Sequence, residues 1–336
     1  MTLEETLAQI KPLDKNAMDV AAKRWDSIAK PLHSLGKMEK LVIQIAGITG
    51  NPDMKIQKRA LVPMCADNGV VEEGVTQTGQ EVTAIVAENF LSGDTSACVM
   101  SRQCGTKVIP VDIGMAVDTK VSKELKVAYG TANMTKGPAM TRAQAVQALE
   151  AGIEMVRRLK EEGYGLLATG EMGIGNTTTS SAVASVLLDR SVEEMTGRGA
   201  GLSGNGLNRK INAIRKAIEV NQPDPKDAIG VLAKVGGFDI AGMAGMFLGG
   251  AALGVPVVID GFISCVAALI AQRICPPAAR LILEALGKEA VIHGEMCLGE
   301  GSGAVTLFPF LDMGIAVYDS MSTFEDIHVE QYEELV

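Results

Sequence analysis

The sequence predicts an α/β fold with a mostly parallel sheet and helices on both faces of that sheet. From Arg59 onward, short apolar strand patterns alternate with longer helical patterns, which is typical of parallel strands joined by crossover helices. The 336 residues include 47% hydrophobic residues, 37 glycines and only 4% aromatic residues, a composition typical of Ala- and Gly-rich α/β enzymes. Four of the predicted strands are also followed by an acidic residue, as expected of a sheet with a ligand crevice at its edge.

The two ends of the chain are predicted to be helical. Residues 1–55 show helices with polar faces, interrupted by a loop at residues 30–36, and form the N-terminal part of a small domain. Residues 56–311 form the α/β domain. Residues 312–336 are acidic, with apolar residues at irregular helical spacing, which predicts a C-terminal helix that returns to the N-terminal helices.

The acidic residues after the strands predict where ligands bind. The strands and their acids are residues 61–65 with Asp67, 108–111 with Asp112, 166–169 with Glu171 and 256–259 with Asp260. In open α/β sheets, ligands bind beyond the carboxyl ends of the strands, so the four acids are expected to rim one crevice. Any one of them could instead cap the helix that follows it.

Residues 240–259 carry no charge and are nominally long enough to span a membrane. Gly249, Gly250, Gly254 and Pro256 interrupt this stretch, which predicts a buried helix of about four turns followed by a short strand. The first residues contain two acids and no apolar core of a signal peptide. We therefore expect a cytoplasmic protein without a membrane partner.

The charge and cysteine patterns exclude several classes of function. A formal net charge of −9 argues against a nucleic-acid partner, since phosphate backbones require clustered Lys and Arg, but leaves room for a small anionic substrate. The six cysteines show no C-x-x-C spacing and the three histidines lie far apart. The sequence therefore predicts reduced, buried thiols, no metal site and no cofactor.

A Gly-rich segment between a predicted strand and a predicted helix is suited to binding phosphate. Its candidate residues are Gly173, Gly175, Asn176, Thr177 and Thr178. Glycines let a ligand approach the backbone, and the first turn of a helix leaves N–H groups and a positive dipole end free. The segment lacks the Lys of a P-loop and a full G-x-G-x-x-G pattern, so it predicts neither a kinase nor a dehydrogenase. A plain strand-to-helix turn is the alternative.

Two further Gly-rich segments carry charged residues. Residues 197–204, which include Gly199, lead into a helix with Lys210, and a lysine there could supply the point charge that a phosphate needs. In Leu298-Gly299-Glu300-Gly301, the glycines leave the Glu300 carboxylate reachable by a substrate, as a general base requires. The alternatives are an ordinary solvated lysine and a turn glutamate without function.

These segments together resemble the nicotinate mononucleotide:5,6-dimethylbenzimidazole phosphoribosyltransferase family, known as CobT. The resemblance runs over nearly the whole chain, in the family's order. The matching motifs are Lys30-Pro31-x-x-Ser34-Leu35-Gly36, Ala66-Asp67-x-Gly69-Val70, Glu73-Gly74-Val75, residues 170–178, Asn221-Gln222-Pro223, residues 234–239, Asp260-Gly261-Phe262 and residues 298–304.

The resemblance implies a Rossmann-like domain with a small helical domain from both chain ends, in a dimer. It implies transfer of ribose-5-phosphate from nicotinate mononucleotide to an aromatic acceptor, with inversion to an α-ribotide, for the lower ligand of a cobamide. By motif position, Glu300 corresponds to the general base and Glu171 to a second carboxylate at the sugar. The phosphate site then corresponds to residues 175–178 with Lys210.

This chain departs from the family pattern around the expected acceptor pocket, which we predict from Thr78, Val86, Met172 and Leu298. Asn68 stands where members have His, and Cys297 where they have Arg. Thr78 and Val86 stand where the benzimidazole enzymes have Ser and Gln. About a dozen residues that usually precede the Leu298 motif are absent between Ile274 and Met296.

An apolar Val86 cannot hydrogen-bond an imidazole edge. A phenol such as p-cresol is therefore expected as the alternative to a dimethylbenzimidazole-type acceptor. The pattern is similar to the paired relatives ArsA and ArsB, a heterodimer that makes phenolic α-ribotides. The partner is then either a second copy or a paralogous subunit, and the chain could be a non-catalytic subunit. The presence of Glu300, Glu171 and Lys210 favours the catalytic role.

Overall fold

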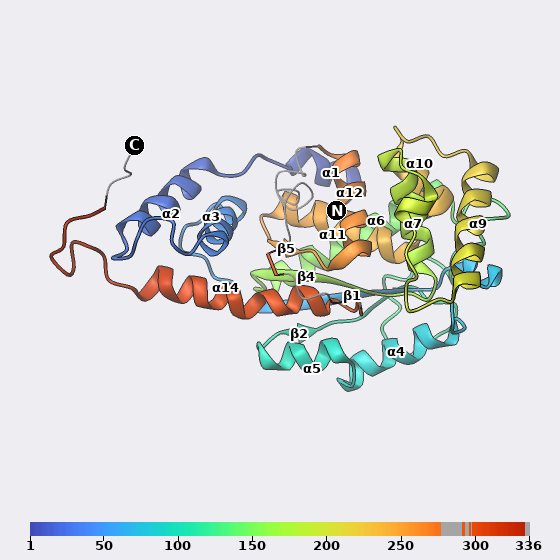
Figure 1. The fold of residues 1–336 in the computed structure, drawn as a ribbon, viewed down its shortest axis with the longest axis horizontal. Helices are drawn as coiled ribbons and strands as arrows, with labels where there is room; N and C mark the ends of the chain where they lie inside the picture. Colours follow the sequence, from blue (N-terminus) through green and yellow to red (C-terminus); the bar gives the residue numbers. More distant parts are fainter. Residues whose placement is uncertain (277–290, 293–295, 297, 333–336) are drawn as a thin grey trace.

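A computed structural model describes residues 1–276, 291–292, 296 and 298–332. Its centre is a parallel sheet, which within these residues has five strands in the order β2-β1-β4-β5, with β3 also paired to β1 (Figure 1). The strands are β1 (Arg59–Ala66), β2 (Lys107–Val108), β3 (Val111–Gly114), β4 (Leu166–Met172) and β5 (Val257–Val258). The predicted α/β fold with a mostly parallel sheet is confirmed.

Helices surround the sheet. They are α1 (Leu3–Gln9), α2 (Lys15–Ser27), α3 (Lys37–Thr49), a short 3₁₀ helix η1 (Gly69–Glu73), α4 (Glu81–Ser92), α5 (Ser96–Gln103), α6 (Arg142–Glu161), α7 (Asn176–Leu188), α8 (Val192–Met195), α9 (Gly204–Asn221), α10 (Ala228–Val235), α11 (Phe238–Leu253), α12 (Gly261–Ile274) and α14 (Ser302–Ser320). In Figure 1, α4 and α5 lie below the sheet, α14 runs across the view at the level of β1, and α6, α7, α11 and α12 lie above the sheet.

The two faces of the sheet bury two separate hydrophobic cores, because side chains alternate along a strand. In β1, Val62 and Met64 face the core shared with α6, α11 and α12. Leu61 and Cys65 face the core shared with α2, α3, α5 and α14. All eight residues of β1 are buried, as expected of a central parallel strand.

All four predicted strands differ from the observed ones in their bounds, and two of the differences change where an acid lies. Residues 108–111 were expected to form one strand but divide between β2 and β3, because Pro110 has no N–H for the ladder. β4 is longer than predicted, so that Glu171 lies inside the strand and pairs with Met64 of β1. The uncharged stretch forms α11 and β5, as predicted, and none of the described helices is both long and apolar enough to cross a membrane.

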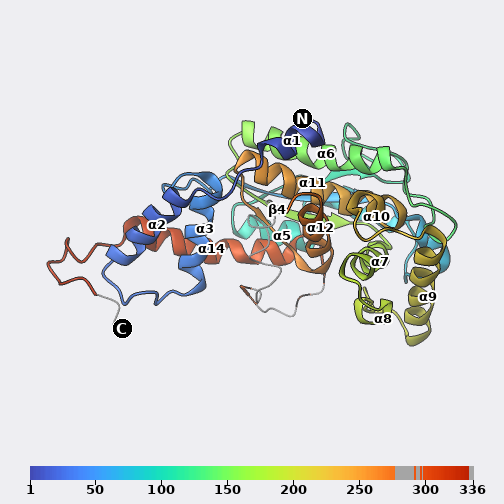
Figure 2. The ribbon, with the colours of Figure 1, turned by 90° about the horizontal axis from the view of Figure 1, so that it is seen from above.

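The small helical part consists of α2, α3 and the far end of α14 (Figure 2). Trp25 and Tyr318 pack with their ring centroids 5.3 Å apart, which joins α2 to α14. The predicted domain boundary at residues 311 and 312 falls inside α14, so one helix connects the sheet to the small helical part. The predicted helix over residues 312–336 is wrong beyond Ser320, because the described residues that follow form turns.

The first helix does not join the small helical part. Leu3 of α1 is buried in the core that α6 and α11 share, and its N–H donates a hydrogen bond to Glu150 Oε1 at 2.8 Å. Residues 1–55 are thus divided between two parts of the molecule. The division into domains stays a prediction.

Candidate active site

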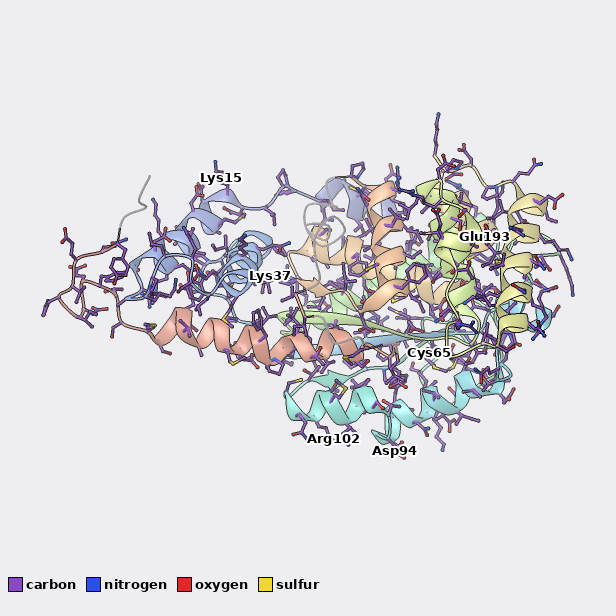
Figure 3. All side chains as sticks on the ribbon, viewed as in Figure 1. Lys15, Lys37, Cys65, Asp94, Arg102 and Glu193 are labelled. Carbon is purple, nitrogen blue, oxygen red and sulfur yellow. The ribbon has the colours of Figure 1, made fainter. Side chains whose placement is uncertain are left out.

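A cleft with a volume of about 1750 Å³ opens at the carboxyl end of β4. One side of it is formed by α3, whose Lys37 lies where the small helical part faces the sheet (Figure 3). The opposite side is formed by the loops before α7 and α9 and by the loop before α14. The cleft therefore lies where parallel sheets bind ligands.

The structure brings together most of the residues that the sequence indicated. Those that line the cleft are Thr78, Val86, Glu171, Met172, Gly173, Gly175, Asn176, Thr177, Gly199, Lys210, Leu298 and Glu300. Thr178 differs: its side chain is fully buried away from the cleft, and its N–H donates to the Gly175 carbonyl at 2.9 Å. Cys297 lies outside the described residues.

Lys210 lies beside the start of α7. Its side chain is only 1% exposed, and its Nζ donates hydrogen bonds to Thr177 Oγ1 at 2.8 Å and to the Gly197 carbonyl at 3.2 Å. Burial lowers the pKa of Lys210 to about 8. A positive helix end and an ammonium group are the kinds of partner that an anion such as a phosphate prefers.

Four carboxyl groups gather around the carboxyl end of β4: Glu171, Asp239, Asp260 and Glu300. Burial, together with the charges of the other three acids, raises the pKa of Glu171 to about 8. Burial also raises the pKa of Asp239 to about 6. Those of the four acids that are ionised favour a positive charge on a bound substrate.

The glycines of the sequence motifs make room for these acids. A Cβ atom on Gly299 would lie 2.5 Å from Glu171 Oε1, and one on Gly173 would lie 2.5 Å from Asp239 Oδ2. Gly299 also has a φ of +85°, which residues with a side chain rarely adopt. Gly173, which the sequence assigned to phosphate, is therefore needed beside a carboxylate.

Glu300 adopts an uncommon backbone conformation between two glycines. Its φ is +62°, a left-handed value that costs a non-glycine residue about 1–3 kcal/mol and is concentrated at functional sites. Its Oε2 accepts a hydrogen bond from the Ala97 N–H, at 3.2 Å, in the first turn of α5. The side chain is thus oriented by a helix amino end, with part of its surface open to the cleft.

Comparisons with known proteins agree with this geometry. A family model described as phosphoribosyltransferase matches residues 10–329. The nicotinate-nucleotide–dimethylbenzimidazole phosphoribosyltransferase of Ruminiclostridium cellulolyticum is 49% identical, with 100% of both chains covered. The enzyme of the same name from Acetivibrio thermocellus is 48% identical, over 98% of this chain and 99% of that one. The chain belongs to the CobT family.

A solved CobT structure has the same fold. CobT from Thermus thermophilus superposes with a TM-score of 0.87 at 35% identity, covering 94% of this chain and 100% of that chain. The alignment to the Ruminiclostridium relative runs over 351 positions, whereas this chain has 336 residues, so this CobT-family chain lacks some positions of that relative. Most of the stretch between Ile274 and Met296, where the sequence indicates a deletion, lies outside the described residues.

Only two of the four acids predicted to rim the crevice line the cleft, namely Glu171 and Asp260. Asp67 and Asp112 are buried instead, and each accepts a backbone N–H, from Ala116 at 2.7 Å and from Met115 at 2.9 Å. Neither of them is the N-cap of a helix, so the alternative of a helix cap does not describe these two either. Asp67 follows β1, whereas Asp112 lies inside β3, and the Asp67 carbonyl accepts the N–H of Thr131 in the loop after β3.

Sequence reasoning gave no role to three residues near the site. Asp239 is fully buried in the first turn of α11 and contacts Asn176. Arg198 and Gln77 both line the cleft, and each donates to a carbonyl of the loop before α9, at Leu202 and Ala200. Asp239 lies in a matching motif, but only the packing of α11 against β4 places it beside Glu171.

Proposed function

We propose that this chain transfers ribose-5-phosphate from nicotinate mononucleotide to an aromatic acceptor and releases nicotinate. The observation that carries the proposal is a single cleft lined both by Lys210 and by a pair of carboxyl groups, Glu171 and Glu300. The names of the full-length relatives agree with this reaction. The product is an α-ribotide used for the lower ligand of a cobamide.

The nucleotide binds through its phosphate at the start of α7. Lys210 supplies the positive charge, and Thr177 supplies a hydroxyl. Gly175 ends the preceding loop with a φ of +93°, which turns the backbone toward the cleft, while Gly199 lies against both Thr177 and Lys210. Backbone N–H groups and one cation are the partners that phosphate prefers in proteins.

Bond breaking at C1′ of the ribose leaves positive charge on the sugar. Glu171, when ionised, stabilises that charge, and the nitrogen of nicotinate takes the electrons of the broken bond. Glu300 accepts the proton of the acceptor as its nitrogen or oxygen attacks C1′ from the opposite face. Attack opposite the leaving group inverts the β-nucleotide to an α-ribotide.

The reaction is tested by incubating the purified chain with nicotinate mononucleotide and a panel of benzimidazoles, purines and phenols. We expect nicotinate release in step with an acceptor ribotide phosphate identified by mass. Release of nicotinate with no acceptor product would indicate a hydrolase. No release with any acceptor, from a chain that still binds the nucleotide, would indicate a non-catalytic subunit.

We propose that the acceptor includes phenol or p-cresol, with dimethylbenzimidazole used equally or less well. The part-buried Val86 of α4 and the apolar Met172 and Leu298 line the cleft with Thr78, so these four residues offer few groups that orient a ring nitrogen.

A dimer, with a second copy or a paralogous subunit, and a cytoplasmic location stay predictions. Molar mass in solution, measured with and without a co-expressed paralogue, tests the dimer.

Val86→Gln should shift the acceptor preference toward dimethylbenzimidazole. The new amide can hydrogen-bond the imidazole edge, and one such bond is worth up to about tenfold in the ratio of kcat/KM values. Competition between dimethylbenzimidazole and p-cresol measures that ratio directly. Ile85→Gln, on the exposed side of the same helix, is the control. A wild-type chain that uses dimethylbenzimidazole readily and never a phenol would contradict the proposed acceptor.

A further inference from the structure

The amide of Asn176 joins two acids from different elements. Asn176 begins α7 and is 5% exposed, and its Nδ2 donates hydrogen bonds to Glu171 Oε2 of β4 and to Asp239 Oδ2 of α11, the latter at 3.0 Å. A primary amide has two N–H donors, so both are used. The Asn176 amide is thereby committed to carboxylates, although its place in the sequence suggests a phosphate ligand.

Asp239 is itself held firmly. It is 0% exposed, lies in the first turn of α11, and accepts the Ile240 N–H on Oδ1 at 2.9 Å. A Cβ on Gly237 would lie 2.5 Å from that same oxygen, so the backbone closes tightly around the carboxylate. The amino end of a helix favours its negative charge. Asp239 is therefore a fixed acceptor that holds one N–H of the Asn176 amide, while the other N–H donates to Glu171.

We propose that Asn176 and Asp239 are positioning residues of the transfer reaction, which hold the Glu171 carboxyl group at the ribose and set the pH range in which it is ionised. The inference rests on the proposed function, in which the ionised Glu171 stabilises positive charge at C1′. Neither residue has to touch the substrate. Both act through Glu171.

Asn176 and Asp239 shift the pKa of Glu171 in opposite directions. The hydrogen bond from Asn176 stabilises the carboxylate and lowers the pKa of Glu171, whereas the nearby charge of Asp239 raises it. Among the described residues, the other titratable groups that face Glu171 are Asp260 ahead of α12, Glu300 ahead of α14 and the Cys65 thiol of β1. Burial raises the pKa of Cys65 well above its ordinary value, so this thiol stays neutral.

Because Asn176 and Asp239 shift the pKa of Glu171 in opposite directions, the pH profile of kcat/KM for nicotinate mononucleotide tests the proposal. Glu171 must lose its proton, so wild-type activity should rise as the pH approaches about 8. This rise is the acid limb of the profile. Asp239→Asn removes a charge that raises the pKa, so its acid limb should move to lower pH. Asn176→Ala removes a hydrogen bond that lowers the pKa, so its acid limb should move to higher pH. At each optimum, kcat should fall up to about 10²-fold, with KM changed less than about threefold.

Two further variants separate the possible outcomes. Asp112→Asn changes another fully buried aspartate, which pairs with Lys126 and not with Glu171, so its acid limb should coincide with wild type. Glu171→Gln should lose most of its activity, and the residual activity should show no acid limb in the pH profile. A Glu171→Gln enzyme that stays active would refute the proposed role of Glu171.

Acid limbs that stay in place, or that move in the same direction in both variants, would refute the positioning role alone, provided that Glu171→Gln is inactive. Should Asp239→Asn not fold, the upward movement in Asn176→Ala decides the question by itself. A variant with lower melting temperature and an unmoved limb counts against the proposal, because a merely structural role predicts that result.

Discussion

Glu300→Gln is expected to lower kcat for ribosyl transfer by about 10²–10⁴-fold, the usual contribution of a general base. The amide keeps the shape of the side chain and still has an oxygen to accept the Ala97 N–H, but it cannot take a proton from the acceptor. The fold should persist, since Gln has the size and shape of Glu and meets the same backbone cost at a φ of +62°. Single-turnover measurements with a saturating acceptor give the rate of the chemical step.

The control for this variant is Glu162→Gln, an exposed glutamate at the end of α6 that does not line the cleft. Both variants should melt within a degree or two of wild type, because a surface or part-exposed Glu to Gln change is typically worth less than about 0.5 kcal/mol. A Glu300→Gln rate within about threefold of wild type would remove Glu300 from the mechanism.

Lys210→Ala is expected to weaken the binding of nicotinate mononucleotide at least tenfold. A charge-assisted hydrogen bond is worth about 1.5–3 kcal/mol, which corresponds to roughly 10- to 150-fold in Kd. Calorimetric titration measures the loss, and Lys216→Ala, an exposed lysine on the same helix α9, is the matched control. Equal affinities of Lys210→Ala and wild type would exclude Lys210 from the phosphate site.

The pH dependence of binding gives a second check on Lys210. The charged ammonium binds phosphate, and burial lowers its pKa to about 8, so nucleotide affinity should fall as the pH rises through about 8. The Lys210→Ala variant should lose this dependence, because it has no group there to titrate. The same variant should lose the alkaline limb of kcat/KM, while the acid limb that depends on Glu171 stays in place.

Much of the fold follows from local patterns. Apolar strands alternating with helices predicted the parallel sheet, and the glycines and proline between residues 249 and 256 predicted the division into α11 and β5. These features were predictable because they depend on side-chain period and on backbone freedom, which neighbouring residues determine. The ends of elements were less predictable. α14 continues across the supposed boundary because Trp25 and Tyr318 pack at its far end, a contact between distant parts of the chain.

The sequence by itself determined the Gly-rich loops, the exposed setting of Glu300 and the presence of Lys210 beside such a loop, because each is a local motif. Only the tertiary structure decided which acids meet. Asp67 and Asp112 were also predicted to follow strands, yet they are buried in backbone contacts, while Asp239 from the start of a helix lies next to Glu171. The pKa of a carboxyl group depends on burial and on charges a few ångströms away, and both are set by packing between elements that are remote in sequence.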